Sequence, residues 1–100
     1  MAAYIIVKSD ISLVNKIEFD NWYQNEHLIE ASHDFGAVGA KRGWIKDSNC
    51  HVAIYKFENI VVAEQALQSK NLKALIKKFD HRWDKKVKRT RELIEINQDL

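Results

Sequence analysis

The chain of 100 residues contains no proline, only three glycines and a single cysteine. One cysteine, Cys50, excludes an internal disulfide. No stretch approaches the ~18 consecutive apolar residues of a membrane-spanning helix, so no membrane contact is expected. The first ten residues, MAAYIIVKSD, lack the cationic start and long apolar run of a signal peptide. Together these absences predict a cytoplasmic protein.

Hydrophobic residues make up 46% of the chain, which is enough for a packed core. The length, and the lack of repeats or linkers, predict one domain over residues 1–100. The net charge is only +2, but residues 77–91 carry eight Lys or Arg against two Asp. Such a run is typical either of a surface that binds an anionic partner or of a solvated helix end followed by an edge strand, and the second interpretation is favoured.

Hydrophobic periodicity and turn residues predict six main elements. The expected order is a strand in AYIIVK, a helix from Ser12 or Val14 to residues 31–34, strands over 35–46 and 51–58, a helix over 60–83 with a break at Ser69-Lys70, and a strand in RTRELIEI. This β-α-β-β-α-β order predicts the α+β, ferredoxin-like fold, a four-stranded antiparallel sheet with helices on one face.

The strands are apolar on both faces, although helices would cover only one. Tyr4 and Ile6 alternate with Ile5 and Val7 in the first strand, and the strand HVAIYKFE shows the same pattern. An uncovered apolar face should be buried by another subunit. The sequence therefore predicts a homodimer with packed sheets.

The stretch FDNWYQNEHL concentrates unusual side chains on one helix. At ~100° per residue, one arc of this helix holds large rings together with polar groups. The members of the arc are Phe19, Trp22, Tyr23, Glu26, His27 and Ile29. Such a helix either anchors a core with rings or presents a histidine and a carboxylate to an apolar cleft.

The segments EFDNWYQNEHLIEA, GAVGAKRGW and HVAIYKFE resemble the EthD-like branch of the dimeric α+β barrel superfamily. The family carries Phe-x-x-Trp-Tyr-x-x-x-His on its first helix, matched here by Phe19, Trp22, Tyr23 and His27. This chain has Ile29 and the turn HDFG where the family often has prolines. The superfamily includes cofactor-free monooxygenases, cyclases, isomerases and haem-degrading enzymes. In several members the ligand lies between the helices and the sheet.

Tyr23 and His27 are the candidate catalytic residues. A neutral imidazole can accept or donate a proton near pH 7, and a tyrosine one turn away can share a hydrogen bond with a ligand. Both side chains would equally serve as core residues. Trp22 and Glu26 are candidate ligand contacts, with Trp22 favoured as a core anchor. An inward Glu26 would need a partner such as Arg42, and an outward one would be solvated.

Trp44, Tyr55 and Trp83 complete the candidate ligand-binding set, because aromatic walls suit a planar molecule as well as an ordinary core. No cluster has metal-ligand spacing, and no cofactor is expected. His27 or His81 could ligate a haem, but no motif indicates one. Nucleic-acid binding is a distant third interpretation, because the third strand lacks the aromatic RNA-binding pattern.

The sequence thus predicts a small homodimer that binds a small, largely apolar organic molecule between helices and sheet. If the protein is an enzyme, the reaction would be a cofactor-independent oxygenation, isomerisation or cyclisation assisted by proton transfer at His27. The alternative is a non-catalytic dimeric binding or structural module whose aromatic residues are all core.

Overall fold

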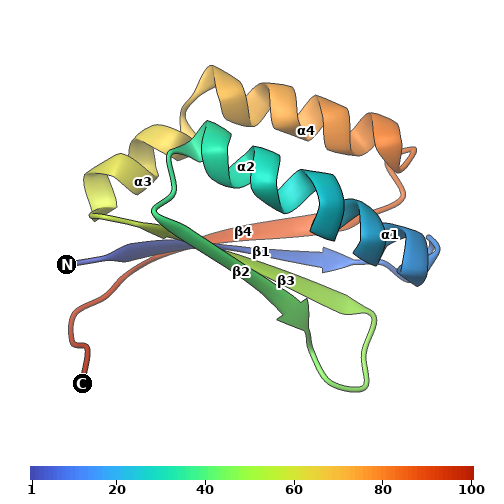
Figure 1. The fold of residues 1–100 in the computed structure, drawn as a ribbon, viewed down its shortest axis with the longest axis horizontal. Helices are drawn as coiled ribbons and strands as arrows, with labels where there is room; N and C mark the ends of the chain where they lie inside the picture. Colours follow the sequence, from blue (N-terminus) through green and yellow to red (C-terminus); the bar gives the residue numbers. More distant parts are fainter.

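Four strands with alternating apolar side chains pair into one antiparallel sheet. In the computed structural model, which describes residues 1–100, they are β1 (Ala3–Asp10), β2 (Gly39–Trp44), β3 (Cys50–Phe57) and β4 (Lys88–Glu95). Their order across the sheet is β2-β3-β1-β4, and every neighbouring pair is antiparallel. All helices lie on one side of the sheet (Figure 1), which confirms the predicted ferredoxin-like fold.

The first helical segment is continuous through α1 (Lys16–Trp22), the π-helical turn η1 (Tyr23–His27) and α2 (Leu28–Phe35). The helix begins later than predicted, because the Asn15 side chain accepts from the backbone N–H of Glu18, whereas Ser12 bonds to Asp10. The segment ends at Gly36, whose φ of 70° suits a residue without Cβ.

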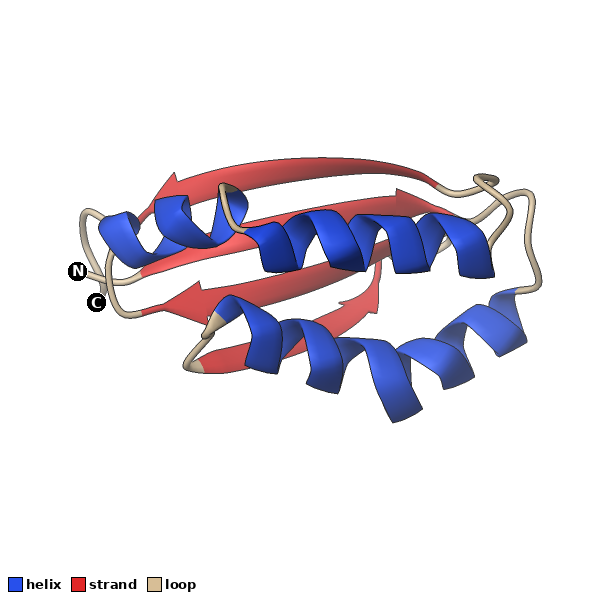
Figure 2. Cartoon of the chain, turned by 90° about the horizontal axis from the view of Figure 1, so that it is seen from above, coloured by secondary structure: helices blue, strands red, loops and turns tan.

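The second helical segment is interrupted close to the predicted break at Ser69-Lys70. It consists of α3 (Ile60–Leu67) and α4 (Lys70–Arg82), and the Ser69 hydroxyl caps α4 by accepting from Leu72. α2 and α4 run side by side over the sheet (Figure 2). No helix combines the length and apolar character needed to cross a membrane.

The core lies between the helices and the inward face of the sheet. Phe19 is fully buried at its centre, with ring centroids 5.4 Å from Tyr23, 6.0 Å from Phe79 and 5.2 Å from Trp83. Offset and edge-on aromatic packing of this kind adds stability beyond the burial of apolar area. Phe19 therefore anchors the core with its ring, in line with one of the two interpretations of this helix.

The opposite face of the sheet carries no helix. The cross-strand pair Ile6 and Ile54, with Tyr4 and Val52 beside it, lies on this face and is only half-buried. The accessible surface of the chain is 6652 Å². A monomer of this mass is expected to expose ~5,900 Å². The chain thus leaves an apolar sheet face open, as the sequence predicts; we call it the open face.

Candidate functional site

A four-residue spacing of buried side chains defines the first helical segment. Phe19, Tyr23, His27 and Ala31 are 0%, 1%, 7% and 1% exposed. In a regular α-helix each step of four residues drifts by ~40°, so four such residues would not share one face. The wider turn η1, in which the N–H of Leu28 bonds to the carbonyl of Tyr23, absorbs this drift. π-helical turns of this kind are frequent at functional sites.

Because of this π turn, the helix phase differs from the predicted one. The predicted inward arc included Glu26, His27 and Ile29, but only His27 is buried, because the π turn changes the rotation of the helix and leaves Glu26 and Ile29 exposed. Trp22 was expected as a core anchor and is only half-buried. Its indole stacks on the imidazole of His27, with centroids 4.5 Å apart and planes 15° apart.

A small cavity, partly open to solvent, lies between the helices and the sheet. Its volume is about 20 Å³, enough for one water-sized group. It is lined by Val7, Tyr23, His27, Phe35, Tyr55, Leu72, Leu75, Ile76, Arg89 and Arg91. The structure therefore brings together three residues of the predicted site, Tyr23, His27 and Tyr55, at one cavity.

His27 is held by rings alone. It lies between the Trp22 indole and the edge of Tyr23, whose centroid is 4.8 Å away. Its imidazole makes no hydrogen bond to another protein group. The histidine side chains that do so are those of His33 and His51. Burial, and then the positive charge of Arg89, lowers the pKa of His27 to about 3. The imidazole is therefore neutral at pH 7 and its lone pair is free.

The two tyrosines at the cavity keep their protons. Burial raises the pKa of Tyr23 and of Tyr55, and the neighbouring Tyr23 hydroxyl raises that of Tyr55 further. Both hydroxyls therefore remain O–H donors at neutral pH. A neutral base and two donors face the same small space.

A wider surface groove lies on the other side of His27. Its volume is about 210 Å³, and its lining comprises Trp22, Glu26, His27, Glu30, Lys78, His81 and Arg82. His27 lines both the cavity and the groove. Glu26 belongs to this groove and not to the cavity.

Arg42 pairs with Asp20 and not with Glu26. The Asp20 carboxylate accepts from the Arg42 guanidinium at 2.8 Å and from the Trp44 indole at 3.0 Å. These hydrogen bonds, that from Arg42 first, hold the pKa of Asp20 below its usual range. Arg42 and Trp44 thus tie β2 to α1 beside the cavity and do not line it.

His51 continues this network. Its Nε2 lies 3.3 Å from Arg42 Nη1, and its ring is fully buried 4.3 Å from that of Tyr23. Because the guanidinium is a donor, Nε2 is the acceptor and Nδ1 carries the hydrogen. That Nδ1 has no partner. Burial, and then Arg42, lowers the pKa of His51 to about 4.

Trp83, the remaining candidate, lies outside the cavity lining. It is 4% exposed at the end of α4, packs on Phe19 and carries the Arg82 guanidinium 4.0 Å above its ring. Its buried indole N–H has no partner. In this structure Trp83 therefore belongs to the aromatic core.

Four polar residues near the site were not identified from the sequence: Asp20, His51, Arg89 and Arg91. A signal for three of them was available in strand alternation. His51 shares the inward phase of Tyr55 on β3, and Arg89 and Arg91 share that of Leu93 on β4. Charged residues at inward positions of a strand are rare unless they are paired or functional.

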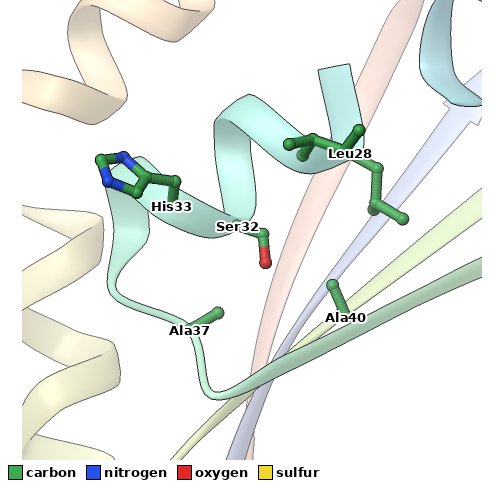
Figure 3. A pocket seen from close by; sticks show the side chains of 6 residues that line it. Leu28, Ser32, His33, Ala37 and Ala40 are labelled. Atoms are coloured by element: carbon green, nitrogen blue, oxygen red, sulfur yellow. The ribbon is translucent and has the colours of Figure 1, made fainter. Parts of the chain in front are cut away.

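Other hollows are larger and more open, and one of about 510 Å³ is lined only by polar residues: Lys77, Asp80, His81, Asp84 and Lys85. A groove of about 440 Å³ runs between α2 and β2 (Figure 3), where Ser32 points toward β2 and Ala40 toward α2. The remainder of its lining is Leu28, Ile29, His33 and Ala37. Two residues of the basic run 77–91 have counter-ions, because Lys78 pairs with Glu30 and Arg89 with Asp80.

Comparisons with known proteins support the fold. No family model and no curated protein sequence matches the chain. An EthD (ethyl tert-butyl ether D) family protein from Bacillus halodurans C-125 superposes with a TM-score of 0.74 at 20% identity, over 96% of this chain and 99% of that one. An N63A mutant of SnoaB, a cofactor-independent oxygenase from Streptomyces nogalater, gives 0.69 at 13% identity, over 99% and 96%. The predicted resemblance is confirmed at the level of the fold.

Proposed function

We propose that the protein binds a small, planar, largely apolar organic molecule between its helices and sheet, with His27 and Tyr23 at the reacting end. One observation carries this proposal. The imidazole of His27 and the hydroxyls of Tyr23 and Tyr55 meet at one cavity, and His27 makes no hydrogen bond to the rest of the protein. Similarity of fold to a cofactor-independent oxygenase supports it.

The size of the cavity requires movement. About 20 Å³ accepts only the polar end of an organic molecule, so its ring must separate α2 from α4 or displace the rings beside His27. Besides their apolar packing, two polar contacts join these helices: Lys78 Nζ lies 2.7 Å from Glu30, and Asn71 donates to the Asp34 carbonyl at 3.1 Å. An exposed ion pair contributes at most ~1 kcal/mol, so the ion pair opposes separation of the helices only weakly.

The chemistry that these groups support is proton transfer. Neutral His27 would take a proton from a carbon acid next to a carbonyl group, giving an imidazolium and an enolate. The tyrosine hydroxyls would donate to the enolate oxygen, and the negative charge of the enolate would stabilise the imidazolium, which the cavity alone disfavours. Isomerisation or cyclisation can follow from an enolate without a further reagent. Oxygenation would also need O₂, which accepts the electrons. The chain's own residues require no cofactor for the proton step.

A non-catalytic module is the second candidate, and the small volume of the cavity favours it. In that case Tyr23 and His27 would only fill space between the sheet and the helices. The two candidate functions predict different effects on ligand binding when an apolar side chain of similar volume replaces His27.

A His27→Leu substitution tests the proposal. A panel of planar aromatic acids, phenols, quinones and amides is screened by thermal shift, since a compound that binds the folded state raises the melting temperature. We expect His27→Leu to stay folded at pH 7, because no partner is orphaned, and to weaken binding of the best compound at least ~10-fold, as loss of a hydrogen bond does.

The matched control is His33→Leu, which changes an exposed histidine of α2. It should leave the thermal shift unchanged. If His27→Leu binds the compound with parental affinity, His27 is a packing residue and the proposed proton transfer is wrong.

We also propose that two chains associate through the open face. Its apolar centre on β1 and β3 is half-buried, and its rim carries Lys8, Glu92 and Lys56. An apolar centre with a charged rim is the usual anatomy of a protein interface. A stable pair would bury ~1,200 Å² or more in total.

A further inference from the structure

Two arginines of β4 face the cavity. Arg89 and Arg91 alternate with exposed Thr90 and Glu92, so both guanidinium groups lie on the helix side of the sheet. They line the same cavity as His27, Tyr23 and Tyr55. Two cations therefore face the space where the proposed ligand would place its polar end.

Only one of the two arginines has a counter-ion. Arg89 Nη2 lies 2.9 Å from the Asp80 carboxylate, and its guanidinium lies 3.7 Å from the Phe79 ring centroid. Its side chain is 10% exposed. Arg91 is half-buried and has no carboxylate within 4.0 Å and no hydrogen bond to protein.

The electrostatic environment of the cavity is accordingly positive. After burial, the largest influences on the pKa of His27 are the charges of Arg89, His51, Lys78 and Arg91, and each of them disfavours a charged imidazole. Charges in a partly buried site are screened less than on the surface. A neutral ligand would leave this field uncompensated, whereas an anionic oxygen would be attracted to it.

We infer that Arg91 determines specificity, selecting planar aromatic ligands that carry one anionic oxygen group, a carboxylate or a phenolate, over neutral ligands of the same shape. This inference rests on the proposed function and names the ligand class. Arg91 would supply a planar two-pronged donor, and the Tyr23 and Tyr55 hydroxyls would donate to the same group. The cavity volume of about 20 Å³ fits one such oxygen.

The test compares two ligands of equal size, naphthalene-2-carboxylate and naphthalene-2-carboxamide, by calorimetric titration of the whole chain at pH 7. A hydrogen bond to a charged group is worth ~1.5–3 kcal/mol. That range corresponds to a ~10- to 100-fold preference of the parent protein for the carboxylate. Arg91→Gln should bind the amide as the parent does and lose the preference to within ~2-fold.

Lys73→Gln is the matched control, because it removes the same unit of charge from an exposed position on α4. It should keep the full preference. Arg91→Lys, which keeps the charge but not the two-pronged geometry, should retain an intermediate preference and serves if Arg91→Gln does not fold.

The outcomes separate the inference from the proposed function. Equal binding of both ligands by the parent, or an unchanged preference in Arg91→Gln, overturns the role of Arg91 and leaves a ligand site in place. Binding of neither naphthalene compound by the parent protein overturns the anionic aromatic class. If no compound of the wider panel binds either, the proposed function fails with it.

Discussion

Lowering the pH from 7 to about 4.5 is expected to lower the free energy of unfolding by several kcal/mol. His27 and His51 are buried and neutral, with pKa values of about 3 and about 4 in the folded chain. In the unfolded chain both return to ~6.5. Below pH 6.5 the unfolded state therefore binds more protons than the folded state, so stability falls as the pH falls.

The expected slope is ~1.4 kcal/mol per pH unit for each histidine. Over two pH units the pair would cost ~3–5 kcal/mol, against a total of ~5–15 kcal/mol for a domain of this kind. The lowered pKa of Asp20 reduces stability only when the pH falls below its ordinary value of 3.8. The loss of stability between pH 6.5 and 4 is therefore attributed to the two histidines.

Urea melts between pH 7.5 and 4.5, at one protein concentration, measure this slope. His27→Gln should flatten it by about half, whereas His33→Gln, at an exposed position, should leave it unchanged. A free energy of unfolding that stays constant across this range would show that neither imidazole is buried and neutral.

Replacing Ile54 by glutamate is expected to halve the mass of the particle in solution. Ile54 lies opposite Ile6 at the centre of the open face, and a carboxylate buried there without a partner costs several kcal/mol. The parent should scatter light as twice 11.7 kDa at micromolar concentration, and Ile54→Glu as a single chain.

Val61→Glu is the control, since Val61 is an exposed apolar residue of α3, 57% accessible, on the helical side of the molecule. It should leave the mass unchanged. Circular dichroism must show that Ile54→Glu is folded. A parent protein that stays folded as a single chain of 11.7 kDa would refute the proposed pairing.

The fold could be predicted from the sequence because its periodicities are local. The alternation in AYIIVK and HVAIYKFE, and the break at Ser69, correspond to β1, β3 and the start of α4. The start of the first helix was less certain, because Ser12 and Asn15 are both suitable caps and only geometry decides between them.

The candidate site was less accessible to sequence reasoning. A period of 3.6 residues places both Glu26 and His27 in the inward arc, and no local pattern predicts the π turn that leaves Glu26 exposed and His27 buried. The only sequence feature that agrees with the π turn is the four-residue spacing of Phe19, Tyr23 and His27. The choice of Asp20 over Glu26 as partner of Arg42 depends on how β2 lies against α1, which no local pattern specifies.

The four histidines of the chain allow the most direct measurement of where a ligand binds. His27 lines the cavity and also the groove of about 210 Å³ that His81 lines, His51 lies in the Asp20 network, and His33 lines the groove in Figure 3. A ligand in the cavity should therefore shift His27 without His81, whereas a ligand in the shared groove should shift both. The ring signals of all four histidines can be followed together by NMR in isotopically labelled protein during a titration with the compound that gives the largest thermal shift.

We predict that the His27 ring signals shift with saturation as the compound binds, that His51 responds through its contact with Tyr23, and that His33 and His81 stay in place. Shifts confined to His33 or His81, with His27 unmoved, would place the ligand on the surface and contradict the central claim that the space beside His27 is the binding site.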